Sequence, residues 1–136
     1  MLKDFHLSIN YNIINLVLEE LRSGLEKNDY TENQNKILMC TFLAKLYNYK
    51  LITSDVIFSS LYMILIYHPD WNFGKREFSL DNTLDRPSNT FRILMVINIL
   101  DTCGMYLAEG NKKEKLSEFI HFLQIYILTK VYYPFS

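Results

Sequence analysis

The stretch from Phe91 to Ala108, FRILMVINILDTCGMYLA, limits the fold more than any other part of the chain. Apolar side chains fill most of its first half, so a helix built from it is apolar over most of its circumference. Such a helix is either the buried centre of a domain or a membrane span, and a span needs about 20 predominantly apolar residues. Arg92, Asn98 and Asp101 interrupt this run. We therefore predict the central helix of a soluble, all-helical domain.

The composition agrees with a single globular domain over residues 1–136. Apolar residues make up 49% of the chain and charged residues 21%, which is typical of a folded protein with a substantial core. Four glycines and three prolines are few, and long helices tolerate this better than a sheet with many tight turns. The net charge of −1 argues against a surface devoted to phosphate groups.

Apolar residues recur at helical spacing in five segments. The predicted helices span residues 11–28, 31–49, 54–67, 87–108 and 112–132. Their mostly short connections favour antiparallel pairs, arranged as an α-solenoid or a bundle. Outside the central helix, the residues expected to face the core are Ile13, Ile14, Val17, Leu18, Leu21 and Leu25; Ile37, Leu38, Phe42 and Leu46; Val56, Ile57, Leu61, Ile64 and Leu65; and Leu116, Phe119, Ile120, Leu123, Ile127 and Val131.

Polar residues and proline mark the predicted helix starts. The expected signals are Asn10 as the first N-cap, a capping box from Thr31 to Gln34, a cap at Thr53, Ser54 or Asp55, and Pro87 in the first turn of the central helix. The irregular segment 68–86 is long for a compact domain, so we interpret it as functional or disordered. Trp71 and Phe73 are expected to pin part of it to the helices.

Residues that carry enzymatic chemistry are scattered along the sequence. Cys40 and Cys103 lie inside apolar helical patterns and are predicted to be buried free thiols. The three histidines, His6, His68 and His121, have no spacing that suits a metal site, and no glycine-rich phosphate loop or GxSxG motif occurs. We therefore predict a protein that is not an enzyme and has no metal or cofactor.

Asp101 and Gly104 are unusual within an apolar helix. An isolated buried carboxylate is prohibitively costly, so Asp101 must be exposed, paired or hydrogen-bonded. We expect a structural strut, in which Asp101 binds backbone donors or a basic side chain such as Arg92 or Lys45, in preference to direct contact with a ligand. Gly104 costs about 1 kcal/mol relative to Ala inside a helix, and close approach of another backbone would explain its presence.

A polar stripe follows the first helix on the side opposite its apolar face. Asn15, Glu19, Arg22 and Glu26 recur every three or four residues along it. A solvated face with a Glu19–Arg22 ion pair explains this pattern, and an acidic surface for a basic partner explains it too. From spacing alone, we favour the solvated face.

Two sequence segments resemble one known family closely. FLAKLYNYK at residues 42–50 and ILDTCG at residues 99–104 are similar to segments of the third middle domain of a nonsense-mediated mRNA decay scaffold, up-frameshift factor two. The resemblance extends from about Ile14 to Lys130. It implies a HEAT-like solenoid of antiparallel helix pairs, as in the middle domain of initiation factor 4G, and a protein-interaction scaffold without catalytic activity. We also expect structural roles for Arg92 and Tyr47, as for Asp101 and Gly104.

The resemblance also implies a partner. In the family, an acidic helix docks the RRM domain of up-frameshift factor three, and the up-frameshift helicase binds through regions outside this chain. Glu19, Arg22 and Glu26 match the charged contacts, whereas Asn15 stands where the family has an acidic residue. Glu20 has an acidic counterpart but points about 100° away from Glu19. Because the family domain continues with further helices, we expect this chain to be its N-terminal portion.

Two other functions remain open at this level. One is direct RNA binding through Lys112, Lys113 and Lys115, and the other is a purely structural domain that packs within a larger scaffold. The N-terminal residues lack the continuous apolar run of a signal peptide. We therefore expect a cytoplasmic protein, with a perinuclear location also compatible, and no membrane partner.

Overall fold

The computed structural model describes residues 2–67, 85 and 89–132, with side-chain detail for 12–67, 85 and 89–131. These residues form five α-helices and one 3-10 turn, and no strand occurs among them. The elements are α1 (Leu2–Lys27), η1 (Tyr30–Glu32), α2 (Asn33–Asn48), α3 (Ser54–Ile66), α4 (Phe91–Leu107) and α5 (Lys112–Tyr132). None of the helices in this part of the chain is long and apolar enough to cross a membrane.

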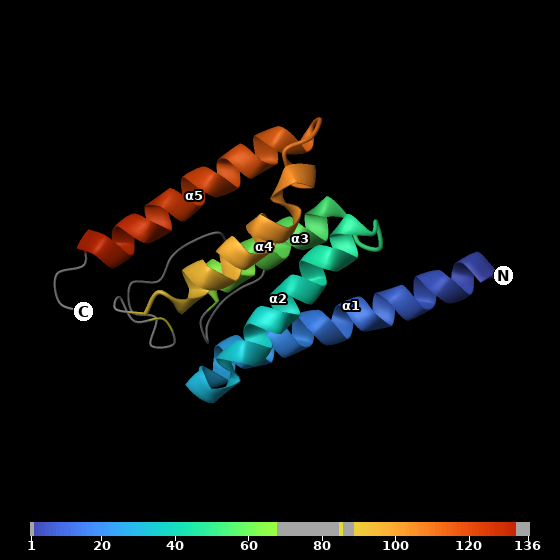
Figure 1. The fold of residues 1–136 in the computed structure, drawn as a ribbon, viewed down its shortest axis with the longest axis horizontal. Helices are drawn as coiled ribbons and strands as arrows, with labels where there is room; N and C mark the ends of the chain where they lie inside the picture. The colour runs from blue at the N-terminus through green and yellow to red at the C-terminus, as the bar shows by residue number, and fades with distance from the viewer. Residues whose placement is uncertain (1, 68–84, 86–88, 133–136) are drawn as a thin grey trace.

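The helices form two layers, as in a HEAT-like solenoid. Helices α1, α3 and α5 make one layer, and α2 and α4 lie side by side in the other, running in the same direction (Figure 1). The core lies between the layers, where the side chains of Leu21, Leu43, Ile57, Leu61 and Ile99 are fully buried. The all-α solenoid predicted from the sequence is confirmed.

The first two helices begin differently from the prediction. Helix α1 starts at Leu2 and not near residue 11, so Asn10 lies inside the helix and is not its N-cap. No glycine or proline occurs before Asn10 to stop the helical turn. The capping box is also wrong, because the Asp29 carboxylate accepts hydrogen bonds from the Thr31 backbone N–H (3.0 Å) and hydroxyl (2.8 Å). This contact forms η1, and α2 begins only at Asn33.

The buried face of α2 is rotated from the predicted one. Leu38 and Phe42 are 53% and 43% exposed, whereas Cys40, Leu43 and Ala44 are fully buried. The small side chains of Cys40 and Ala44 let α2 pack closely against its neighbours, whereas Leu38 and Phe42 lie on its outer side. Two residues at the ends of the predicted apolar stripes are also not buried as expected. Ile13 in α1 is 37% exposed and Val131 in α5 is 67% exposed.

Helix α4 contacts α2, α3 and α5, so its central position is as predicted. Its outer side also carries large apolar side chains, however, because Leu94 and Ile97 are about half exposed. Asp101 is also exposed and forms no ion pair or hydrogen bond with any described residue, so it is not the strut that we expected. The prediction for Gly104 was wrong too, because a Cβ built there would meet only the Leu100 side chain, at 3.9 Å.

Arg92 joins three helices inside the protein. Its side chain is 3% exposed, and Nη1 donates hydrogen bonds to the carbonyl oxygens of Ile64 (3.2 Å) and Tyr67 (2.8 Å) at the end of α3. The Asp85 carboxylate lies 3.9 Å from Arg92 Nε and 2.7 Å from Lys130 Nζ of α5. Burial lowers the pKa of Arg92, and the nearby Asp85 carboxylate opposes this effect. The guanidinium therefore satisfies carbonyl groups at the end of α3 that have no partner within the helix, and it has a counter-ion beside it.

The neighbourhood of Arg92 predicts a large loss of stability on its removal. Arg92→Met would leave the carbonyls of α3 and the Asp85 carboxylate short of a buried partner, at a cost of about 3 kcal/mol in the free energy of unfolding. Urea denaturation followed by circular dichroism measures this loss. Arg22→Met is the control, because it removes two partly exposed ion pairs and one long hydrogen bond to the Tyr67 hydroxyl, and leaves no buried charge unpaired. Equal losses in the two variants would contradict the assigned role of Arg92.

The open space beside Gly104 predicts the opposite effect. Gly104→Ala should raise the free energy of unfolding by up to about 1 kcal/mol, because alanine favours the helix and meets no obstacle. Gly110 is the matched control, since its φ of +61° is strained for alanine. Gly110→Ala should therefore lower the free energy of unfolding in the same urea measurement. A destabilising Gly104→Ala would mean that the site is tighter than the structure indicates.

Candidate functional site

The polar stripe of α1 is exposed and organised by one arginine. Val17, Leu21 and Leu25 bury the opposite side of the helix, which turns Asn15, Glu19, Arg22 and Glu26 outward. We call these four residues the acidic face. They occupy four consecutive helical turns, and their exposure agrees with the spacing that the sequence shows.

Arg22 holds both glutamates of the acidic face. Its guanidinium forms a two-point ion pair with Glu19, in which Nε donates to Oε2 at 3.2 Å and Nη2 binds Oε1. Nη1 donates to Glu26 Oε2 at 3.3 Å and to the Tyr67 hydroxyl at 3.4 Å. The hydrogen bond from Arg22 lowers the pKa of Glu19, so this carboxylate is ionised at neutral pH. The two glutamates are therefore held in place with their remaining lone pairs open to solvent.

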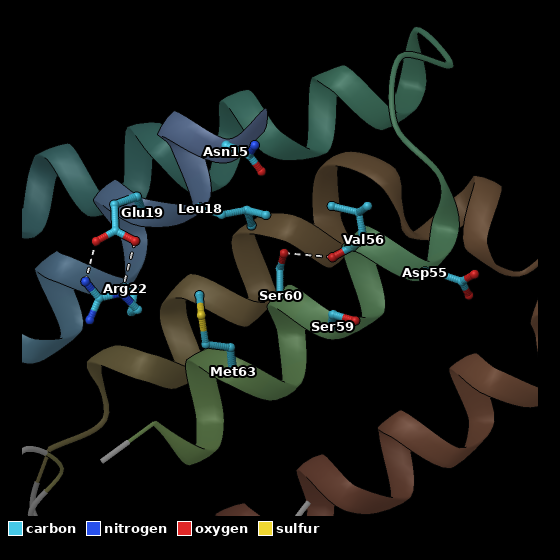
Figure 2. A pocket seen from close by; sticks show the side chains of 9 residues that line it. All are labelled: Asn15, Leu18, Glu19, Arg22, Asp55, Val56, Ser59, Ser60 and Met63. Atoms are coloured by element: carbon cyan, nitrogen blue, oxygen red, sulfur yellow. Dashed lines mark hydrogen bonds and ion pairs between the residues drawn. The ribbon is translucent and has the colours of Figure 1, made fainter. Parts of the chain in front are cut away.

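A groove of about 500 Å³ runs between α1 and α3 beside the acidic face (Figure 2). Leu18, Val56 and Met63 give it an apolar lining, and the Ser60 hydroxyl is satisfied because it donates to the Val56 carbonyl oxygen at 2.7 Å. Glu19 borders the groove on the α1 side and Asp55 on the α3 side. The site thus combines an apolar depression with carboxylates on two edges, which suits a basic surface that carries an apolar side chain.

The fifth residue predicted for partner binding lies elsewhere. Glu20 lines a separate hollow with Lys27, Asp29 and Lys36, on the side of α1 that faces α2. Sequence reasoning missed Lys36, which is buried against Gly24 with its Nζ 5.6 Å from the Phe91 ring centroid. A lysine in the middle of a helical pattern gave no signal of burial, because the space for it is created by a glycine on another helix.

The predicted RNA contacts are partly engaged within the protein. Lys112 Nζ donates to the Tyr47 hydroxyl at 3.0 Å and lies 5.6 Å from the centroid of its ring, which gives Tyr47 a contact between α2 and α5. Lys115 Nζ pairs with Asp55 at 3.0 Å, and Lys113 is exposed. The three lysines therefore do not act together as one unpaired basic patch.

Reactive groups do not gather at this site. Within the described residues, no three His, Cys, Asp or Glu side chains come together to hold a metal ion. His121 is exposed, while His6, His68, Pro87, Trp71 and Phe73 lie outside the residues with described side chains. Both cysteines are free and buried, as predicted, and burial raises the pKa of Cys40 to about 12 and that of Cys103 to about 11. The thiols are therefore protonated at neutral pH and poor nucleophiles.

The fold defines a class of protein, the helical-repeat domains. The profile of the MIF4G domain matches residues 5–134, so the chain belongs to the MIF4G domain family. It is 41% identical over 122 residues to the Arabidopsis thaliana protein "Regulator of nonsense transcripts UPF2", a match that covers 90% of this chain and 10% of that protein.

Two other relatives agree with this match. The human protein "Regulator of nonsense transcripts 2" is 38% identical over 122 residues, covering 90% of this chain and 9% of the relative. "Nonsense-mediated mRNA decay protein 2" of Saccharomyces cerevisiae is 35% identical over 117 residues, covering 86% of this chain and 10% of that protein. The chain therefore spans about a tenth of the length of the curated relatives it matches.

The state of the thiols gives a testable prediction. In the native protein, Cys40 should react with Ellman's reagent at pH 8 about a thousandfold more slowly than a free thiol, because a pKa of about 12 instead of about 9 removes most of its thiolate. Both thiols should react rapidly once urea unfolds the chain. Rapid labelling of either thiol in the folded protein would contradict its burial. Circular dichroism under the same conditions would verify that the fold is intact.

Proposed function

We propose that this domain is an interaction module of a nonsense-mediated mRNA decay scaffold, that it corresponds to the third middle domain, and that it binds the RRM domain of up-frameshift factor three. The acidic face of α1, beside the apolar groove, is the observation that carries this proposal. Relatives whose names place them in nonsense-mediated decay match nearly the whole of this chain, which supports the proposal that it acts in this process. We further propose a non-catalytic, cytoplasmic role, with the helicase bound through regions outside this chain.

The geometry of the acidic face suits a basic partner. Because Arg22 already holds Glu19 and Glu26, a partner need not order these side chains on binding, and less entropy is lost. Lysine or arginine side chains of an RRM would meet the outward lone pairs, and the charges would steer its approach. An apolar side chain placed between those basic residues would enter the groove over Val56 and Met63 and add apolar burial.

Asn15 reduces the charge of this surface. It lies one turn before Glu19 on the same face, where an acidic side chain would add a third carboxylate in line. Binding here therefore depends more strongly on Glu19 and Glu26 than it would on a face with three carboxylates. RNA binding is the weaker alternative, because Lys112 and Lys115 are already paired within the protein.

Charge reversal on the acidic face should weaken RRM binding. Glu26→Arg replaces an exposed carboxylate with a cation beside Arg22, and we expect the dissociation constant to rise at least tenfold. Isothermal titration of the chain with the RRM domain at about 0.15 M salt measures this change. Circular dichroism of both proteins tests that they remain folded.

Glu20→Arg is the matched control for this experiment. It makes the same change in net charge one helical position away from Glu19, but on the side of α1 that faces α2. We expect its effect on the dissociation constant to be less than about twofold. Equal weakening by Glu20→Arg and Glu26→Arg would mean that net charge alone causes the effect. Unchanged binding by Glu26→Arg would mean that the acidic face is not part of the interface. Binding of RNA in place of the RRM domain would favour the alternative.

A further inference from the structure

The outward side of the α2–α4 layer carries large apolar side chains that the acidic face does not use. Leu38 and Phe42 of α2 are 53% and 43% exposed, and Leu94 and Ile97 of α4 are 54% and 50% exposed. They recur at i, i+4 on α2 and i, i+3 on α4, so each pair follows a single stripe along its helix. Exposed leucine and phenylalanine that cluster in this way mark an interaction surface more often than scattered ones do.

Hydrogen bonds between α2 and α4 fix how the two stripes align. The Thr41 hydroxyl donates to Asn98 Oδ1 at 2.7 Å, and Asn48 Nδ2 donates to the Thr102 carbonyl oxygen at 3.0 Å. The two helices are therefore parallel, as Figure 1 shows, and residues at the same level along the axes of α2 and α4 can be matched. The four apolar side chains lie side by side at one end of the layer.

Two opposite charges lie farther along the same face. Lys45 on α2 falls between Thr41 and Asn48, and Asp101 on α4 falls between Asn98 and Thr102, so the two exposed side chains flank the face at one level. Neither forms an ion pair with a described residue. The valley between the helices therefore has a cation on one side and an anion on the other.

The size of this face limits what it can bind. Packed helices lie about 8–10 Å apart, so the valley between two parallel helices is wide enough for one more helix. The twelve residues of α4 from Leu94 to Met105 span about 16 Å, and two helices are about 20 Å wide, which gives about 320 Å². A stable dimer buries about 800 Å² per partner. The face is too small for that and fits three turns of a single amphipathic helix.

We propose that the outward face of α2 and α4 is a second interaction surface, which binds one amphipathic helix of a partner protein. The helix places its apolar side chains over Leu38, Phe42, Leu94 and Ile97. It carries an acidic residue on the flank that meets Lys45 and a basic residue on the flank that meets Asp101. This surface belongs to the other layer from the acidic face, so it can be occupied at the same time as the groove between α1 and α3.

Three designed peptides test this proposal. Each is an alanine-rich helix of about 20 residues with leucine at i, i+3, i+7 and i+10, a length at which such helices form in water. The first has glutamate on one flank and lysine on the other, the second has glutamate on both flanks, and the third has lysine on both. Reversing the direction of a bound helix exchanges its two flanks. The comparison of the mixed peptide with the uniform peptides therefore does not depend on the direction in which the helix lies.

Fluorescence anisotropy with the folded chain should rank the peptides. We expect the mixed peptide to bind about fivefold more tightly than either uniform peptide at about 0.05 M salt, as exposed ion pairs contribute this much. Asp101→Lys should shift the preference to the peptide with glutamate on both flanks. Leu94→Glu should weaken all three at least tenfold, whereas Leu16→Glu, at an apolar position of α1 that is 67% exposed, should have no effect.

Three results would overturn the proposal. The first is that no peptide binds, and the second is that peptides bind but Leu94→Glu leaves their affinity unchanged. The third is self-association of the chain in sedimentation equilibrium that Leu94→Glu abolishes, which would assign this face to a second copy. None of these results bears on the RRM titration, since Glu26 lies on the other layer.

Discussion

A buried cation at the junction of α3, α4 and α5 is the interaction on which the rest of the solenoid depends. Helix α3 ends inside the protein, so its last carbonyl groups must find donors away from water. Arg92 supplies them from the first turn of α4, and Asp85 compensates the charge that this brings into the core. Lys130 then extends the network to α5, and the Tyr126 hydroxyl donates to Asp85 at 2.6 Å. One set of polar contacts thus fixes the order in which three helices stack.

This internal network leaves the outer surfaces of the two layers available for different tasks. On the α1–α3 side, ionic contacts among Glu19, Arg22 and Glu26 organise a charged face beside an apolar groove. On the α2–α4 side, the exposed residues are mainly apolar, and the charged residues on this face occur singly, one on each helix. The two faces therefore lie on opposite sides of the domain and differ in the proportion of charged to apolar surface. Two partners with different chemistry can bind such a domain without competing for one surface.

Local patterns were sufficient for the approximate positions of the helices and for the exposure of the acidic face, but not for contacts between distant residues. The stripe of Glu19 and Arg22 follows from helical spacing, because only the period of the helix is needed. The burial of Arg92 depends on the end of α3, more than twenty residues earlier in the chain, and on Lys130 in α5. Likewise, Lys36 is buried because Gly24 on α1 makes room for its stem. A single sequence carries no signal of these pairings before the helices are placed.

The errors on α2 and α4 have a common cause, and it is informative. Both helices have apolar residues on two sides, so hydrophobic periodicity could not tell the core side from the outer side. On α2 the larger side chains, Leu38 and Phe42, were assigned to the core, although the smaller Cys40 and Ala44 are buried there. On α4 the same ambiguity made Asp101 look like a charge inside a buried helix, while in fact it lies on the second apolar side. A helix that buried only one face would have no need of apolar residues on the other. The excess apolar content that misled the sequence interpretation is therefore the same property that makes the α2–α4 face suited to a partner.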